Sequence, residues 1–189
     1  KIRKLGPTYI KLGQFLATRS DIIGLAMAQD LRHLQDRLPP FGDKQVARLL
    51  ATELDHAEAV LKDMGPAIAA ASIAQVHVAT HRETGQKLAV KFLRPGVEER
   101  LRGELELLGR MAKWAERFFP ITHRLRPVDA ITTLARSING ETDFRMEAAA
   151  LSEMAENTAK DKGFRVPDII WEASGRRVLT MSWVDGVSA

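Results

Sequence analysis

The middle of the chain alternates between two sets of side chains at every second residue. A period of two is typical of a half-buried strand, and here it covers residues 74–79. The two faces of this strand are Ala74, Val76 and Val78 on one side, and Gln75, His77 and Ala79 on the other. A glycine-containing turn at residues 83–85 leads into a second strand with apolar positions 88, 90 and 92. The pattern therefore predicts a hairpin over residues 69–95, ended by Pro95-Gly96.

Apolar residues at intervals of three and four predict helices before this hairpin. The expected helices cover residues 8–19, 25–37, 43–54 and 55–64. We place Thr8 at the N-cap of the first helix and a boundary at Gly65-Pro66. Residues 1–64 are therefore expected to form a helical extension.

Beyond the hairpin, the pattern predicts more helices and then a return to strands. The expected elements are an inserted helix at 97–119, a helix at 128–159 that follows Pro127, and strands at 166–170 and 178–184 within a final segment, 164–186. Residues 65–189 are therefore expected to form an α+β domain with a small antiparallel sheet and an inserted helix.

Composition excludes several classes of site and partner. The chain has no cysteine, which removes disulfides, thiolate metal sites and a cysteine nucleophile. Its net charge of +4 is concentrated in the middle, which suits an anionic partner such as a nucleotide phosphate or an anionic membrane surface. Without a helix-turn-helix, zinc-finger or RNA-binding aromatic pattern, we expect no nucleic-acid partner. With no apolar run long enough to cross a bilayer and no signal peptide, we expect a cytoplasmic location.

Lys91 is the main candidate for chemistry in the hairpin, since it lies on the face opposite Val90 and Phe92. Asp143 and Glu147 are four residues apart, share a helix face and stand among apolar residues, so a cation such as Lys91 is a natural partner. A small-residue loop, a hairpin and a lysine late in the second strand favour the nucleotide-binding edge of a protein-kinase-like lobe. The alternative is that a strand lysine is a solvated edge residue and an alanine run is a helix.

The end of the 97–119 helix combines aromatic and basic residues. They are Trp114, Phe118 and Phe119 beside Arg110, Lys113, Arg117, Arg124 and Arg126. One interpretation is a core-facing stripe with a solvated basic face. The other is a surface that docks on a membrane or a partner protein.

Four motifs in order resemble the UbiB family, the atypical protein-kinase-like ATPases associated with ubiquinone biosynthesis. The resemblance covers essentially the whole chain. The motifs are Lys11-Leu12-Gly13-Gln14, the alanine-rich loop Ala69-Ala70-Ala71-Ser72, Leu88-Ala89-Val90-Lys91, and Glu141-Thr142-Asp143 followed by Glu147.

The resemblance implies a role for each matching residue. Lys91 would pair with Glu147 and hold the ATP phosphates beneath the alanine-rich loop, whose alanines do not readily adopt positive φ. Lys11 and Gln14 would meet Glu141 and Asp143 over the active site and fill the place of a peptide substrate. The implied catalytic residues are Lys91, Glu147, Lys11 and Gln14, and the implied Mg²⁺ ligands are Glu141 and Asp143.

The resemblance also implies an adenine-binding hinge near the end of the chain. Met181 would be the gatekeeper, and the hinge would be Ser182-Trp183-Val184. The family commonly has glutamate where this chain has Ser182. Hinge recognition uses backbone groups, so this difference leaves the expectation of adenine binding in place.

The implied protein is an ATPase or atypical kinase that uses ATP and Mg²⁺ in ubiquinone biosynthesis. It would be peripheral at the inner membrane, with isoprenoid quinone precursors and other quinone-biosynthesis proteins as partners. No catalytic-loop aspartate or Asp-Phe-Gly follows Gly186, so we expect the carboxy-terminal lobe to be absent and the chain alone to be inactive. The alternative is a non-catalytic lipid-binding or scaffold module.

Overall fold

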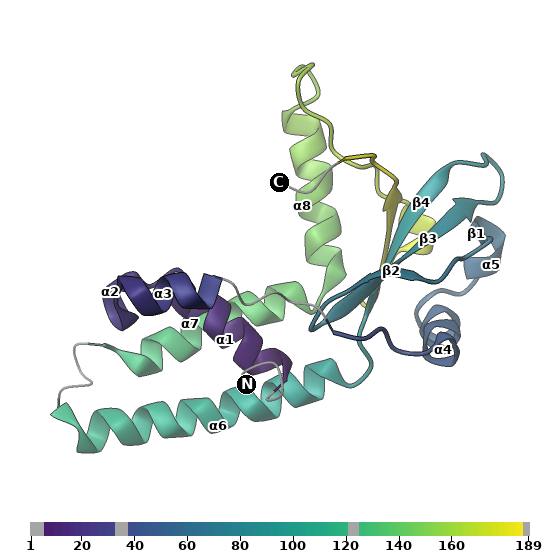
Figure 1. Cartoon of the computed structure of the whole chain (residues 1–189). Helices are drawn as coiled ribbons and strands as arrows, with labels where there is room; N and C mark the ends of the chain where they lie inside the picture. Colours follow the sequence, from purple (N-terminus) through teal and green to yellow (C-terminus); the bar gives the residue numbers. More distant parts are fainter. Residues whose placement is uncertain (1–5, 33–37, 121–124, 187–189) are drawn as a thin grey trace. The chain divides into compact units, whose positions relative to one another are not determined.

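The computed structural model of the chain describes residues 6–32, 38–120 and 125–186 (Figure 1). The chain divides into two compact units, and each combines segments that are distant in sequence. The first, called here the helical unit, combines residues 1–37 with 95–139. The second, the sheet unit, combines residues 38–94 with 140–189.

The helical unit contains α1, α2, α3, α6 and most of α7. Their bounds are Pro7–Ala17, Ser20–Ile23, Leu25–Arg32, Val97–Phe118 and Pro127–Glu141. The prediction that Thr8 caps the first helix is wrong, because Gly6 is the N-cap and Pro7 is the first helical residue. Proline suits that position, since the N–H that it lacks has no partner within the helix. The inserted helix predicted at 97–119 is confirmed as α6.

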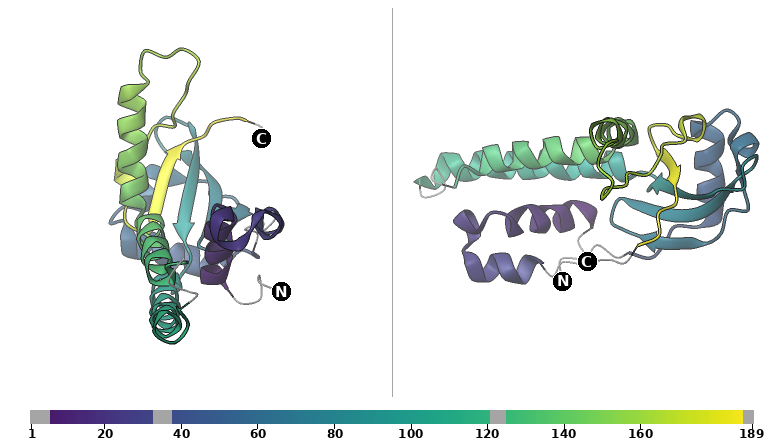
Figure 2. Two further views of the ribbon diagram at one scale, coloured as in Figure 1. Left: turned by 90° about the vertical axis from the view of Figure 1, so that its left-hand side faces the viewer. Right: turned by 90° about the horizontal axis from the view of Figure 1, so that it is seen from above.

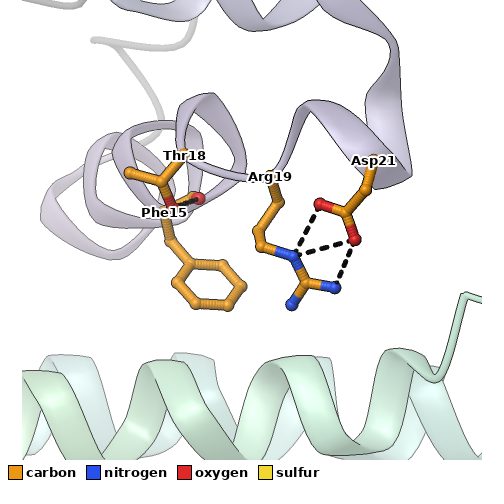
Figure 3. Close-up of polar contacts among 4 residues, drawn as sticks. All are labelled: Phe15, Thr18, Arg19 and Asp21. Carbon is orange, nitrogen blue, oxygen red and sulfur yellow. Dashed lines mark hydrogen bonds and ion pairs between the residues drawn. The ribbon is translucent and has the colours of Figure 1, made fainter.

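The short helix α2 was not predicted, and side-chain bonds mark its separation from α1 (Figure 3). The Thr18 hydroxyl donates to the Phe15 carbonyl oxygen at 2.7 Å, at the end of α1. Arg19 donates to both carboxylate oxygens of Asp21, at 2.7–3.1 Å. This contact lowers the pKa of Asp21 and raises that of Arg19, mainly through their hydrogen bonds. The predicted helix at 25–37 begins as α3, and its last five residues lie outside the described ranges.

The sheet unit is built on an antiparallel sheet. Its strands are β1 (Leu61–Lys62), β2 (Ala67–Ala70), β3 (Ala74–His81), β4 (Lys87–Leu93) and β5 (Val178–Ser182). Three of them form the order β3-β4-β5, and both β1 and β2 pair with the outer edge of β3. The predicted hairpin is therefore confirmed, with Gly85 in the left-handed conformation (φ 71°) at its turn.

Helices cover the two faces of this sheet differently (Figure 2). The helices α4 (Asp43–Glu53) and α5 (Ala57–Val60) pack on the face that carries Leu88, Val90 and Phe92, and form the core with them. The helix α8 (Phe144–Asn157) lies along the other face, beside β5. Residues 38–64 therefore belong to the sheet unit. Burial of each large apolar side chain of α4 against the sheet contributes about 1.5–3 kcal/mol to this packing.

The buried face of β3 is the one that carries its polar residues. Gln75, His77 and Ala79 are almost fully buried, whereas Val76 and Val78 are half-exposed. Hydrogen bonds make this possible: Gln75 Nε2 lies 2.8 Å from His77 Nε2, and His77 Nδ1 lies 2.8 Å from the Gly65 carbonyl oxygen. Buried polar groups are tolerated when their hydrogen bonds are satisfied. Val76 and Val78, which are only partly buried, belong to the face that carries Lys91.

Three further predictions of secondary structure are wrong. The helix expected at 55–64 is reduced to α5, Ala57–Val60, and is followed by the strand β1, Leu61–Lys62. The helix expected at 128–159 is two helices, α7 and α8, because Asp143 leaves the helical conformation and caps α8 through the Arg145 N–H. The strand expected at 166–170 is reduced to a single bridge between Ile169 and Met181. Pro167 has no N–H for a strand ladder, and a 3-10 helix, Trp171–Ala173, follows.

Candidate active site

Lys91 and Glu147 form an ion pair on the α8 side of the sheet. Lys91 Nζ lies 2.9 Å from Oε1 and 2.7 Å from Oε2 of Glu147. The two side chains are 26% and 38% exposed, so the pair is desolvated in part and still open to a ligand. Lys91 Nζ lies 4.8 Å from the centroid of the Phe144 ring, and Phe144 is buried. The aromatic ring and the carboxylate together fix the position of the ammonium group.

The start of α8 positions Glu147 for this contact. Asp143 is the N-cap, and the Phe144 N–H donates to the Arg176 carbonyl oxygen at 2.9 Å, just before β5. Glu147 follows one turn later, where the helix dipole favours a negative charge. The sheet places Lys91 opposite Val76 on β3 and Leu179 on β5. Two independent anchors, a strand register and a helix cap, therefore bring the two residues together.

A half-buried apolar surface lies beside Lys91 on the same face of the sheet. It consists of Val76 and Val78 from β3, Ala89 from β4 and Met181 from β5. Val78 pairs with Ala89, and Ala89 pairs with Met181, so the three form a row across the strands. A flat apolar surface beside a held cation has the character of a site for an aromatic base with an anionic tail.

The alanine-rich loop is largely a strand. Ala69 and Ala70 lie in β2 and pair with Val76 and Gln75, while a turn over residues 71–73 joins β2 to β3. The Ala71 N–H donates to the Ala74 carbonyl oxygen at 2.7 Å, and Ser72 is fully buried. No residue from 67 to 76 has a positive φ. This backbone is thus one that alanine adopts without strain.

Asp143 holds Arg145 with both of its carboxylate oxygens. Arg145 Nε and a terminal guanidinium nitrogen donate to Asp143 at 2.9 and 2.6 Å. These hydrogen bonds are the main cause of the lowered pKa of Asp143 and of the raised pKa of Arg145. Asp143 therefore serves here as a helix cap and an arginine partner. Arg145 was not among the residues predicted for the site, although an arginine two residues after a capping aspartate is a recognisable pattern.

The hinge residues divide between the two faces of the sheet. Met181 lies on the face that carries Lys91, whereas Ser182 is buried on the opposite face. The Ser182 hydroxyl accepts from the Asp168 N–H at 2.9 Å, and its own N–H donates to the Asp168 carbonyl oxygen. The Ser182 side chain is thus engaged structurally. The Val184 N–H makes no hydrogen bond with a described residue, so it remains a candidate donor.

Trp183, the middle residue of the predicted hinge, contacts Asp185 and Lys87. Its indole N–H donates to Asp185 at 2.7 Å, and Lys87 Nζ lies 3.9 Å from the ring centroid. Its backbone N–H donates to the Lys87 carbonyl oxygen. The hinge backbone is therefore fixed to the start of β4.

Lys11 and Gln14 belong to the helical unit, whereas Glu141, at the end of α7, belongs to the sheet unit. Lys11 and Gln14 lie on α1, half-buried and three residues apart, and Glu141 is the last residue of α7. Their predicted meeting with Asp143 over the active site stays a prediction. Among the described residues, no cluster of three or more His, Asp or Glu side chains is arranged to hold a metal ion.

A cavity of about 500 Å³ lies on the other face of the sheet, away from this site. It is lined by residues of α4, by residues 64–66 and by His77, and neither Lys91 nor Glu147 contributes to it. Lys91 and Glu147 thus lie apart from this cavity, on the α8 side of the sheet.

Comparison with known proteins gives one family. The family model described as "ABC1 atypical kinase-like domain" matches residues 33–189. The chain is 36% identical to "Probable protein kinase UbiB" of Marinobacter nauticus over 188 residues, which cover 98% of this chain and 34% of that protein. Proteins of the same description from Pseudomonas putida and Shewanella piezotolerans are 36% and 33% identical, again over 98% of this chain. The chain thus spans about a third of the length of these relatives.

Proposed function

Because the chain belongs to the ABC1 atypical kinase-like family, we propose that its sheet unit binds ATP on the face that carries Lys91. In the complete protein, this binding supports an ATPase or atypical kinase activity that serves ubiquinone biosynthesis at a membrane surface. The observation that carries the proposal is the Lys91–Glu147 ion pair beside a half-buried apolar surface. A lysine–glutamate pair of this kind is what protein kinases require to hold the nucleotide phosphates.

Each part of the site has a separate task in this proposal. Lys91 binds the phosphates, and Glu147 holds the ammonium group in position through hydrogen bonds to both carboxylate oxygens. The row of Val78, Ala89 and Met181 packs against one face of the adenine ring. The Val184 N–H donates to the edge of the ring, and the turn after β2 covers the phosphates. Bound ATP supplies the phosphoryl group, and these residues position it.

The residues of the site fit ATP better than they fit Mg²⁺. Mg²⁺ prefers carboxylate oxygens, water and phosphate oxygens in octahedral geometry. Both Asp143 oxygens accept hydrogen bonds from Arg145, which compete with a metal ion for their lone pairs. We therefore assign no step to Mg²⁺ at Asp143, and leave Glu141 as the other candidate ligand.

The membrane part of the proposal rests on α6. Leu107, Met111, Trp114 and Phe118 follow helical spacing and are all exposed. Arg110, Lys113 and Arg117 lie to one side of this stripe and are exposed as well. Trp114 contacts the rings of Phe118 and Phe119 at centroid distances of 5.5 and 5.3 Å. An exposed aromatic stripe beside cations matches the anionic interface of a bilayer.

The same stripe favours a second candidate function, a scaffold or lipid-binding module that does not use ATP. The described residues contain no helix of the length and apolarity that crossing a membrane requires. Membrane contact would therefore be peripheral for the described part of the chain in either function. The ion pair separates the two, since a scaffold has no use for a partly desolvated lysine beside an adenine-sized surface.

ATP turnover by the full-length protein, with and without vesicles that contain anionic lipid, tests the proposal. We expect turnover that depends on Lys91 and rises when vesicles are present. Vesicle binding without any Lys91-dependent turnover or ATP binding would favour the scaffold function.

A further inference from the structure

The turn that joins Ala70 of β2 to Ala74 of β3 is called here the alanine turn. Residues 38–41, called here the strap, lie along this turn. The Leu38 N–H donates to the Ala70 carbonyl oxygen at 3.1 Å. Three residues later, the Phe41 N–H donates to the Gln75 side-chain oxygen at 2.7 Å, and Gln75 Nε2 donates back to the Phe41 carbonyl oxygen at 3.3 Å. In Figure 1 this dark blue segment leads directly into α4. The strap is thus bonded to β2 before the turn and to β3 after it.

Arg94 joins the strap to the turn itself. One guanidinium nitrogen donates to the Pro39 carbonyl oxygen at 3.1 Å and to the Ala71 carbonyl oxygen at 3.0 Å. The backbone N–H of Arg94 donates to the Ile73 carbonyl oxygen at 2.8 Å. The guanidinium carbon lies 5.6 Å from the centroid of the Phe41 ring. A single residue just after β4 therefore contacts the strap, the start of the turn and its end.

The alanine turn is held both from within and from outside. Within it, the Ala71 N–H donates to the Ala74 carbonyl oxygen, and the side chains of Ser72 and Ile73 are buried. From outside, Arg94 donates to the Ala71 carbonyl oxygen, and hydrogen bonds to a charged donor are stronger than those between neutral groups. The Arg94 guanidinium therefore contributes to the orientation of the Ala71 peptide.

We infer that Arg94 is a positioning residue for the alanine turn, with residues 38–41 as the support against which it acts. This inference rests on the proposed function in one respect: the turn must contact the phosphates for its order to affect nucleotide binding. A turn that is held before ATP arrives loses less conformational freedom when ATP binds. Removing the Arg94 contacts should therefore loosen the turn first and weaken nucleotide binding as a result.

Amide hydrogen exchange in the full-length protein without nucleotide tests the first part. Arg94→Met keeps an unbranched apolar stem like that of arginine and removes the guanidinium donors. Arg82→Met is the matched control, because Arg82 donates to the carbonyl oxygens of Glu58 and Leu61 in the same unit. Exchange at residues 70–74 should rise about fivefold in Arg94→Met, which corresponds to one net hydrogen bond, and should not change in Arg82→Met. Equal exchange in both variants would overturn the inference.

ATP affinity of the same variants tests the second part. We expect Arg94→Met to weaken ATP binding about three- to tenfold, and Arg82→Met to leave it unchanged. If Arg94→Met were poorly folded, Arg94→Lys retains a cation with a donor and should give the same changes at smaller size. Loosened exchange with unchanged ATP affinity would overturn the role of Arg94 in nucleotide binding. Lys91→Ala, measured alongside, separates the two proposals, because a loss of ATP binding there upholds the proposed function whatever Arg94 does.

Discussion

Gln75 and His77 are hydrogen-bonded to each other on the buried face of β3, where Gln75 Nε2 lies 2.8 Å from His77 Nε2. The Gln75 amide is the donor, so His77 Nε2 accepts and His77 Nδ1 carries the hydrogen that goes to the Gly65 carbonyl oxygen. A chain of hydrogen bonds thus runs from Phe41 through Gln75 and His77 to Gly65. This chain connects the segment just before α4 to the segment just before β2 through the inside of the sheet unit.

Replacing Gln75 with leucine should therefore destabilise the protein. The change leaves the Phe41 peptide and a buried histidine nitrogen unsatisfied, which costs about 1–3 kcal/mol. Urea unfolding measures this free energy. Gln86→Leu, at an exposed position after the hairpin turn, is the control and should be nearly neutral. Equal stability of the two variants would show that the buried chain contributes nothing.

The hairpin was predictable from the sequence because it depends on local rules. Alternation along the second strand placed Lys91 on the face opposite Val90 and Phe92, and the strand pairing agrees. The need of a half-buried carboxylate for a cation pointed to Asp143 or Glu147 as the partner of Lys91, and the resemblance to the UbiB family singled out Glu147. The helix α6 was equally readable, since its apolar positions repeat over six turns.

The remaining features depend on contacts that a periodic pattern does not encode. Hydrophobicity alone favours Val76 and Val78 as the inner face of β3, yet side-chain hydrogen bonds allow Gln75 and His77 to occupy it. The break between α7 and α8 depends on the cap that Asp143 provides. The support that Arg94 gives to the alanine turn comes from residues 38–41, which are distant in sequence.

Acid should weaken the start of α8 through Asp143. The pKa of Asp143 is lowered in the folded protein, chiefly by Arg145, so its contribution to stability is complete above the ordinary carboxyl pKa of about 3.9. That contribution is lost as the pH falls through the lowered value. Asp143→Asn keeps a capping oxygen and removes the charge, so the variant should lose less stability than the parent between pH 6 and pH 3. Thermal unfolding across this range measures the difference. Parallel curves for the two proteins would contradict the assignment.

Glycine in the alanine turn should loosen it. Because Ala70 and Ala71 have ordinary backbone angles, a glycine there gains freedom and gives no relief of strain, at a cost of about 0.5–1 kcal/mol. We expect either substitution to shift the affinities for ATP and ADP, measured by calorimetry on the full-length protein. Ala51→Gly on α4 has a similar cost in stability and should leave both affinities unchanged. Unaltered affinities in Ala70→Gly and Ala71→Gly would remove the turn from nucleotide binding.

The aromatic stripe of α6 should mediate contact with anionic membranes. Replacing Trp114 and Phe118 with alanine removes two exposed rings, and we expect at least a tenfold loss of binding in vesicle sedimentation. Trp171→Ala is the control, since that tryptophan is similarly exposed and belongs to the sheet unit. Undiminished vesicle binding by the double variant would show that the stripe does not contact membranes, and would leave a structural role or a protein partner as its function.

The direct test of the Lys91 assignment is ATP binding by the full-length protein, titrated by calorimetry for the parent, Lys91→Ala and Lys62→Ala. Lys62 is a half-buried strand lysine of the same unit, on β1, and serves as the control. Lys91→Ala leaves Glu147 without this partner, which costs on the order of 1 kcal/mol for a partly exposed pair, so the fold should survive. We predict that ATP binding is lost in Lys91→Ala and retained in Lys62→Ala. Parental ATP affinity in a folded Lys91→Ala protein would contradict the assignment of this face as the nucleotide site.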